Sequence, residues 1–342
     1  MASVKTLLEH DPPTATELGI GTFVFSDAYS VFDWGQMPDE IPEKGASLCS
    51  MGAATFEALE ADGIPTHYLG VGDAEKPDSI NDCEEAPDRM VIELTTVPEL
   101  PFDNGVYDYA HFHAVSPTNY LIPLEIVYRN TVPIGSSLRR RTDPATHDLD
   151  FAEWPDHSVD LVEPVVEFST KFESSDRYLD RSEAEEIAGE APLDRLETLA
   201  RDVNQTVTRL ADRAGLTHLD GKIECLYHDG TIKVADVAGT LDENRFSYDG
   251  RQLSKEVIRQ YYSETNPAWV AAVREAKKAA AANNDPDWRK RVSIDPEPLP
   301  ATAIDTVADM YGAVANEYVD QHLFTAPPLH AVANRLDQLI EV

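Results

Sequence analysis

The chain has 342 residues, of which 62 are Asp or Glu and 28 are Lys or Arg, so its formal net charge is −34 at pH 7. Because 42% of the residues are hydrophobic, the chain has enough apolar side chains for a sizeable core, which excludes a disordered acidic tail. A field of this sign also disfavours nucleic acid as a partner, since that binding depends on Lys and Arg that neutralise phosphates.

The first part of the chain is expected to be mainly strand. Runs rich in β-branched and aromatic residues occur at residues 22–25, 67–69, 90–94 and 124–128. One helix interrupts them at about residues 46–61 and is closed by Asp62 and Gly63. We therefore predict a mainly β N-terminal lobe over residues 1–130.

Helical patterns dominate the second part, after a polar loop at residues 139–160. Residues 192–213 carry apolar side chains at helical spacing and end before Gly215. Further helices are expected at residues 254–262, 268–282 and 303–320. The mixture predicts an α+β fold of two lobes with a cleft, in which residues 131–342 form an α+β C-terminal lobe.

Between these helices, residues 221–236 are typical of a β-hairpin that presents a lysine and two carboxylates. Strand alternation puts Lys222 and Glu224 on one face. Glu224 and Asp236 share a face only if the loop has an odd number of residues, so we expect a three-residue loop at 228–230 with Gly230 left-handed. Two acids and a lysine suit a magnesium nucleotide, because Mg²⁺ is typically held by one or two carboxylates plus phosphates. A surface hairpin in a very acidic protein is the alternative.

Two more segments combine charge with turn-forming residues. Residues 27–35 lead from a strand towards a helix, where acidic side chains can bind sugar hydroxyls and Lys44 can help bind phosphate; a turn that caps itself is the alternative. Arg129 is delivered by a strand and is followed by a Gly-Ser-Ser turn and by arginines at 139–141, which predicts an anion site. Pairing of these arginines with surface acids is the alternative there.

The cysteines and the start of the chain indicate a compartment. Cys49, Cys83 and Cys225 are odd in number and widely spaced, which fits neither a zinc site nor a disulfide framework. The first residues lack the apolar stretch of a signal peptide, and no run of about 18 apolar residues occurs. We therefore expect a cytoplasmic protein without a membrane partner, and a homo-oligomer stays open.

Taken in order, six segments resemble the signature of the SAICAR synthetase family, the phosphoribosylaminoimidazole-succinocarboxamide synthetases of purine biosynthesis. Ser-Asp-Ala-Tyr-Ser-Val-Phe-Asp at 26–33 looks like the family's Thr-Asp-Arg-x-Ser-x-Phe-Asp, and Ile-Pro-Glu-Lys-Gly at 41–45 looks like its Ile-Pro-x-Lys-Gly. The other similar segments are residues 125–136, 222–236, 242–245 and 254–259. Six matches in the right order are hard to obtain by chance, and the acidic composition suggests a divergent, haloarchaeal-type member.

The resemblance implies a SAICAR synthetase-like α+β fold, with an antiparallel N-terminal lobe, a mixed C-terminal lobe and an ATP cleft between them. It also implies an ATP-dependent ligase that joins L-aspartate to the carboxylate of 5-aminoimidazole-4-carboxylate ribonucleotide. The implied intermediate is an acyl phosphate, and the products are SAICAR, ADP and phosphate. This route is chemically sound because a carboxylate repels a nucleophile, whereas phosphate is a good leaving group.

Residue by residue, the resemblance implies that Lys222, Glu224 and Asp236 bind ATP, and that the two acids hold its Mg²⁺. Arg129 and the acid pair are the implied catalytic residues, with Asp176 near the incoming amine. The residues expected around the ribonucleotide, where Lys255 and Arg259 meet its phosphate, are Asp27, Ser30, Asp33, Lys44, Arg129, Ser136, Asp242, Arg245, Lys255 and Arg259.

Three departures from the family pattern bear on function. The family opens with Gly-Lys-x-Arg, whose lysine and glycine face the ATP phosphates, whereas the strand expected first here follows residues 18–21 without a lysine. The arginine that usually follows Asp27 is Ala28, and the acid after Asp236 is Val237. These departures leave two alternatives: a paralogous ATP-dependent amide ligase with a different amine or carboxylate, and a ribonucleotide-binding pseudoenzyme.

The spread of acidic residues along the whole chain fits a surface hydrated in concentrated salt. At low salt these charges repel one another over longer distances, because the Debye length is about 10 Å at 0.1 M and about 3 Å at 1 M ionic strength. We therefore expect the Tm to rise between dilute and molar KCl. Thermal unfolding followed by circular dichroism at both salt concentrations checks this, and an unchanged Tm would contradict the high-salt interpretation.

Overall fold

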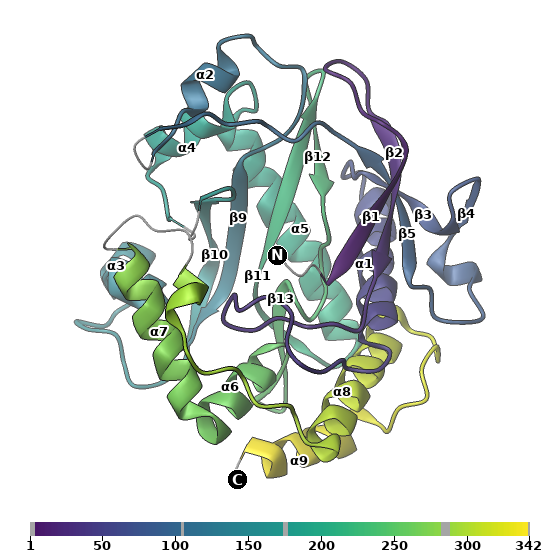
Figure 1. Ribbon diagram of the computed structural model, residues 1–342, viewed down its shortest axis with the longest axis vertical. Coiled ribbons are helices and arrows are strands. Elements are labelled where there is room, and N and C mark those ends of the chain that lie inside the picture. The colour runs from purple at the N-terminus through teal and green to yellow at the C-terminus, as the bar shows by residue number, and fades with distance from the viewer. Residues whose placement is uncertain (1–3, 104–105, 174–176, 282–287, 341–342) are drawn as a thin grey trace.

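The computed structural model describes residues 4–103, 106–173, 177–281 and 288–340, and its two larger sheets are antiparallel and lie side by side (Figure 1). The first sheet has five strands in the order β1-β2-β5-β3-β4. These strands are β1 (Lys5–Asp11), β2 (Gly19–Phe25), β3 (Tyr68–Asp73), β4 (Lys76–Asp78) and β5 (Arg89–Leu94). They form the predicted antiparallel N-terminal lobe.

Helix α1 (Lys44–Ala61) follows β2 and packs against this first sheet. Its first turn lies very close to the end of β2, because a Cβ on Gly45 would come within 2.9 Å of the Ser26 backbone. At the other end, Gly63 adopts φ +80° and Ile64 donates its backbone N–H to Leu59, which closes the helix. The predicted helix at 46–61 is therefore confirmed, and it begins two residues earlier.

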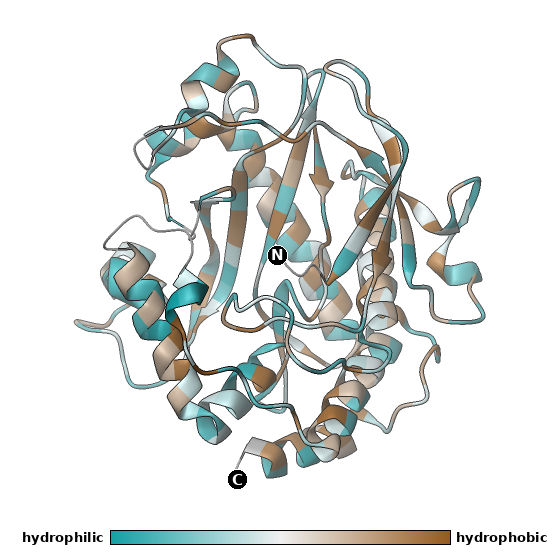
Figure 2. Cartoon of the chain, in the orientation of Figure 1, coloured by the Kyte–Doolittle hydropathy of each residue, from teal (hydrophilic) through white to brown (hydrophobic). Residues whose placement is uncertain are grey.

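The second sheet has seven strands, with the path β10-β9-β11-β13-β14 and with β8 and β12 paired to β11. Its strands are β8 (Asn119–Leu121), β9 (Leu124–Val132), β10 (Val159–Thr170), β11 (Thr217–His228), β12 (Thr231–Ala235), β13 (Asn244–Tyr248) and β14 (Arg251–Leu253). Hydrophobic and hydrophilic bands alternate along β9 and β11 in Figure 2, as expected for strands that bury one face more than the other.

Strand β11 changes partners along its length. Its first half pairs with β9 and β13, and its second half pairs with β8 and β12. Strand β12 in turn meets the N-terminal lobe, because Val234 exchanges backbone hydrogen bonds with Pro65 and His67 at 2.9 and 3.0 Å. The hairpin β11–β12 therefore joins the two lobes through main-chain contacts.

Helices pack on the second sheet and beside it. Helix α5 (Leu193–Arg213) packs on β9, β10 and β11 through an apolar stripe that includes Leu196, Val203 and Leu210. The remaining longer helices are α4 (Arg181–Ala188), α6 (Glu256–Thr265), α7 (Pro267–Ala281), α8 (Ala301–Val319) and α9 (Leu329–Ile340). Helix α8 packs against α1, so apolar contacts run without a break from one lobe to the other.

Short elements complete the described chain. They are β6 (Phe102–Asp103), β7 (Val106–Tyr107), α2 (Tyr109–His113), α3 (Leu138–Arg141) and the 3₁₀ turns Ile80–Asp82, Pro144–His147 and Trp288–Arg291. Helix α3 and one of these turns lie inside the segment 139–160 that we expected to be a loop. None of the helices within the described ranges is long and apolar enough to cross a membrane.

The predicted fold class, α+β with an antiparallel first lobe, is confirmed. The lobe boundary at residue 130 stays a prediction, and residues 119–132 pair with β11 of the second sheet. The elements that we did not predict include β1, β10, α4 and the C-terminal helix α9.

Gly221 marks the closest approach between strands in the second sheet. A Cβ there would lie 1.9 Å from Asn244 Oδ1 and 2.7 Å from the Tyr128 ring. We expect Gly221→Ala to lower the free energy of unfolding by about 1–3 kcal/mol, because both neighbours are buried and must move. Gly135→Ala is the matched control, since nothing lies within 4 Å of its added Cβ. Urea unfolding of both variants tests this, and equal stabilities would contradict it.

Candidate active site

A cavity of about 390 Å³ is lined by β9, β11 and the turns that follow β9 and precede β13. Its charged lining residues are Asp33, Glu125, Arg129, Asp220, Lys222, Asp242, Glu243, Arg245, Lys255, Glu256 and Arg259. Arg and Lys among hydroxyl-binding acids suit a ligand that carries both anionic groups and hydroxyls.

A larger cavity of about 660 Å³ lies on the other side of β9, between β10 and α5. None of the residues that we predicted from the sequence lines it. Arg201 and Arg209 at its edge already bind Glu197 and Asp62, at 2.9 and 2.6 Å. The concentration of charged groups therefore places the candidate site in the smaller cavity.

The sequence prediction is concentrated in that smaller cavity. Eight of the predicted residues line it: Asp33, Arg129, Ser136, Lys222, Asp242, Arg245, Lys255 and Arg259. Glu224 lies next to them on β11, and Asp236 directly follows β12. Residues that are far apart in the sequence come together here because β9 pairs with β11.

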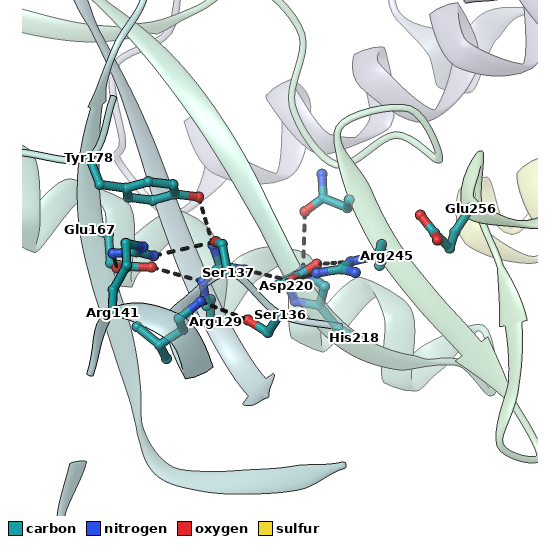
Figure 3. Close-up of polar contacts among 12 residues, drawn as sticks. Arg129, Ser136, Ser137, Arg141, Glu167, Tyr178, His218, Asp220, Arg245 and Glu256 are labelled. Carbon is teal, nitrogen blue, oxygen red and sulfur yellow. Dashed lines mark hydrogen bonds and ion pairs between the residues drawn. The ribbon is translucent and has the colours of Figure 1, made fainter. Parts of the chain in front are cut away.

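Arg129 is held by contacts to all three nitrogens of its guanidinium group (Figure 3). It donates to Glu167 at 2.9 Å, to Asp220 at 3.2 Å and to the Tyr178 hydroxyl at 2.9 Å. Arg245 donates to the same Asp220 carboxylate at 2.7 Å. Asp220, which is buried, therefore fixes two arginines side by side along the cavity wall.

A further arginine, Arg141, contacts two of the side chains that bond Arg129. Arg141 donates to Glu167 at 2.5 Å, and its guanidinium lies 3.6 Å from the centre of the Tyr178 ring. Burial alone would raise the pKa of Glu167, but the hydrogen bonds and charges of both arginines hold that pKa below its usual value. Glu167, Tyr178 and Asp220 were not singled out in the sequence, although Asp220 lies two residues before Lys222 on the same strand.

Asp242 is another acid of the cavity that meets several partners. Its carboxylate accepts from Lys44 at 3.0 Å and from the Tyr311 hydroxyl at 2.7 Å, and it lies 3.6 Å from Lys255. Burial opposes the charge, but Lys255 and Lys44 hold the pKa of Asp242 well below its usual range. Lys44, which we expected at a phosphate, is fully buried behind Asp242 and acts on the cavity through it.

The hairpin prediction is wrong in its loop. His228 is paired with Thr231, so the loop has two residues, Asp229 and Gly230, which both have positive φ. In that register Glu224 lies opposite Ala235 and shares a face with it. Asp236 is the next residue, so strand alternation alone would put its side chain on the other face. The two acids still come together because Asp236 leaves the strand with a left-handed φ of 61°, which turns its side chain.

This acid pair lies among three lysines. Lys171 pairs with Glu224 and Lys5 pairs with Asp236, each at 2.5 Å, and Lys222 pairs with Glu125 at 2.7 Å. Burial and the charge of Asp236 raise the pKa of Glu224, and the lysines offset this only in part. Burial would raise the pKa of Asp236 as well, but Lys5 and Lys171 hold it below its usual value.

The environment of the acid pair fits a cation. Glu224, which is buried, and Asp236, whose side chain is 24% exposed, still repel each other and would gain from a cation near both. Across the described part of the chain, no group of three or more His, Cys, Asp or Glu side chains is placed to hold a metal ion. Two carboxylates are nonetheless what Mg²⁺ typically takes from a protein when phosphates supply further oxygens.

Lys5 is the functional residue that sequence reasoning missed most clearly. We took residues 22–25 as the first strand and found no lysine before it. The first strand is instead β1, which pairs with β2 so that Lys5 lies opposite Phe25. This pairing brings the Lys5 ammonium to Asp236, and the Asp236 charge keeps the pKa of Lys5 above its usual value despite burial.

Two predicted residues lie elsewhere, and a third is outside the described part of the chain. The carboxylate of Asp27 accepts backbone N–H groups from Glu43 and Gly45 at 3.1 and 3.0 Å, so it bonds the start of α1 and does not cap its own turn. Ser30 does not line the cavity. Asp176 lies outside the described residues, so its placement near an amine stays a prediction.

Comparisons with known proteins agree with this arrangement. The family model of SAICAR synthetase matches residues 14–276. A protein of Archaeoglobus fulgidus, provisionally named a phosphoribosylaminoimidazole-succinocarboxamide synthase, is 40% identical over the full length of both chains. The synthase of Thermoplasma acidophilum is 35% identical over 71% of this chain and 78% of its own.

Solved structures show the same fold. SAICAR synthase of Saccharomyces cerevisiae, in complex with SAICAR, is similar with a TM-score of 0.61 and 19% identity over 94% of each chain. A SAICAR synthetase in complex with ADP is similar with a TM-score of 0.55 and 22% identity, over 87% of this chain and 99% of that one.

His218 lies beneath the cavity on β11, and burial lowers its pKa to about 4. Its Nε2 lies 3.1 Å from Asn244 Oδ1, which can only accept, so the proton lies on Nε2 and Nδ1 accepts from the Thr208 hydroxyl at 2.8 Å. Because this pKa is below the unfolded value of about 6.5, the stability that neutral His218 contributes is lost as pH falls from 6.5 towards 4.

We expect the stability advantage of the wild type over His218→Gln to shrink by about 2 kcal/mol between pH 7 and pH 5. Urea unfolding at both pH values measures it. His228→Gln, at a partly exposed position further along the same strand, is the control for loss of a ring that is not buried. A constant difference for His218→Gln would contradict the burial argument.

Proposed function

Because the chain belongs to the SAICAR synthetase family, we propose that it is an ATP-dependent carbon–nitrogen ligase of purine biosynthesis. It joins L-aspartate to the carboxylate of 5-aminoimidazole-4-carboxylate ribonucleotide. The carboxylate oxygen attacks the terminal phosphorus of ATP and ADP leaves. The aspartate nitrogen then attacks the acyl carbon, the C–O bond to phosphate breaks, and SAICAR and phosphate are released.

One observation carries this proposal: Lys222 belongs to two neighbouring sets of groups. It lines the cavity together with Arg129 and Arg245, and it also lies within electrostatic reach of Glu224 beside the acid pair. A phosphoryl donor at the acid pair and a carboxylate in the cavity would meet near this ammonium. Its pKa stays well above the usual value despite burial, because Glu243 and Glu125 surround it, so the charge persists through the reaction.

Glu224 and Asp236 are the residues proposed to hold Mg²⁺. When bound, Mg²⁺ screens the charge of the phosphates and of the departing phosphoryl oxygen. Lys5 and Lys171 supply positive charge on either side of the pair, within 2.5 Å of its two carboxylates. We propose that Lys5, on the first strand of the N-terminal lobe, takes over the role at the ATP phosphates that the resemblance assigns to the family's Gly-Lys loop.

The cavity residues are proposed to hold the ribonucleotide. Arg129 and Arg245 are preorganised by Asp220, so they can neutralise a carboxylate without reorganising. Lys255 and Arg259, at the start of α6, suit the phosphate. Asp33 and Asp242 suit ribose or amine hydrogens because charged neighbours hold the pKa of each below its usual value, which keeps both ionised as acceptors.

Where the enzyme works is also a proposal. The charge of −34 and the free, mostly buried cysteines fit a reducing cytoplasm of high ionic strength. The substrates are small molecules, and we propose no nucleic-acid or membrane partner.

The test is turnover in molar KCl with Mg-ATP, the carboxylated aminoimidazole ribonucleotide and aspartate, with product followed by mass and ADP by a coupled assay. We expect SAICAR and ADP in equal amounts. Asp236→Asn should lower kcat by roughly a hundredfold or more, because it removes one charge from the proposed metal pair. Asparagine tolerates the left-handed φ at this position, so the backbone is kept.

Asp229→Asn is the matched control, since it makes the same change at another left-handed position of the same hairpin, away from the acid pair. It should turn over as the wild type does. Full activity of Asp236→Asn would rule out its metal role, and ribonucleotide binding without ADP release by the wild type would favour a changed substrate or a pseudoenzyme.

A further inference from the structure

The turn that carries Asp33 into the cavity has a strained backbone. Phe32 and Asp33 both have φ of 55°, a left-handed conformation that costs energy for residues other than glycine. Two such residues in succession persist only when their surroundings hold them in place. Asp33 lines the cavity with Lys255 and Arg259, so the strained turn presents its carboxylate to the site.

The contacts that hold this turn come from α7 and the 3₁₀ turn Trp288–Arg291. Lys277 forms an ion pair with the Asp33 carboxylate. Arg289 donates to the backbone carbonyls of Asp33 and Trp34, with Nε at 3.0 and 2.8 Å. Asp33 is thus held through both its side chain and its backbone, and the following residue, Trp34, is held through its backbone.

Aromatic packing supports the same turn from one side. Phe32 and Trp34 lie edge-on to the fully buried Trp269, with ring centres 5.7 and 5.6 Å away. Trp34 also meets Trp288, and the cationic groups of Lys277 and Arg289 lie 5.0 and 4.8 Å from the Trp288 ring. The tryptophans therefore orient the two basic residues as well as the turn.

Lys277 and Arg289 do not themselves line the cavity, and both come after residue 276, where the match to the family model ends. We infer that they are positioning residues, which hold the Phe32–Asp33 turn in its strained form so that the Asp33 carboxylate stays aimed at the ribonucleotide. The identity of that ligand rests on the proposed function, whereas the hold on the turn does not.

The main experiment is a double-mutant cycle on ribonucleotide binding, measured by titration calorimetry in molar KCl. Lys277→Met and Arg289→Met should each raise the Kd about threefold to tenfold, with little change in the KM for ATP. In the Asp33→Asn background both effects should largely disappear, because the basic residues act through that carboxylate. Lys277→Arg should restore binding.

The matched controls are Lys278→Met and Arg274→Met, which make the same changes on exposed positions of α7 and should leave the Kd within about twofold. Effects that persist undiminished in the Asp33→Asn background would mean direct contact with the ligand and would overturn the inference. An unchanged Kd in both variants would overturn it too.

A ligand-free measurement keeps the inference testable if the proposed substrate does not bind. Acrylamide quenching of tryptophan fluorescence should increase in Lys277→Met and Arg289→Met, because Trp34 becomes more accessible when the turn is released. The increase should be smaller in the Trp34→Phe background, where loss of the basic side chains uncovers only Trp288, and it should be absent in both control variants. Quenching that stays at the wild-type level would overturn the hold on the turn, whereas failure to bind the ribonucleotide would count only against the proposed function.

Discussion

The site depends on charge matching along one face of β11. Strand alternation puts Asp220, Lys222 and Glu224 on that face, and each meets an opposite charge from another element. Asp220 binds arginines of β9 and β13, Lys222 binds acids of β9 and of the segment before β13, and Glu224 binds a lysine after β10. For the buried Glu224, removing its lysine partner would leave a buried charge without an ion pair, which costs more than the pair contributes. The register of β11 is therefore fixed by electrostatics as well as by hydrogen bonds.

Such matching is demanding in a chain with 62 acids and 28 Lys or Arg. Most acidic side chains face solvent, where a surplus is tolerated and salt screens it. At the cavity the two signs are nearly balanced, because Lys44 and Lys255 share one carboxylate and Arg129 and Arg245 share another. Lys and Arg side chains are scarce in this chain, and several of them lie where anionic ligands would bind. They weaken the negative field at the cavity, although the protein as a whole is negatively charged.

The sequence allowed the helices with long apolar stripes and the hairpin to be predicted, because these depend on local periodicity. It did not allow three things that depend on distant pairing. Lys5 reaches Asp236 only because β1 adds to the sheet beside β2. The face of Asp236 depends on its own left-handed φ, which the loop-length argument could not include. Asp27 and Lys44 were assigned to a ligand because their patterns suit one, whereas helix capping and burial behind Asp242 give the same residues structural partners.

Asp242 shows why the lobes and the C-terminal helices form one functional unit. Its carboxylate is bonded by Lys44 of α1 and by Tyr311 of α8, and Lys255 approaches it from the start of α6. The Tyr311 hydroxyl is buried and would be unsatisfied without this acid, and Lys44 would be a lone charge in the core. A displacement of α1 against α8 would break these contacts before it changed much apolar area. The position of Asp242 in the cavity wall therefore depends on how α1 packs on α8. Most of the other lining residues come from the second sheet and its loops.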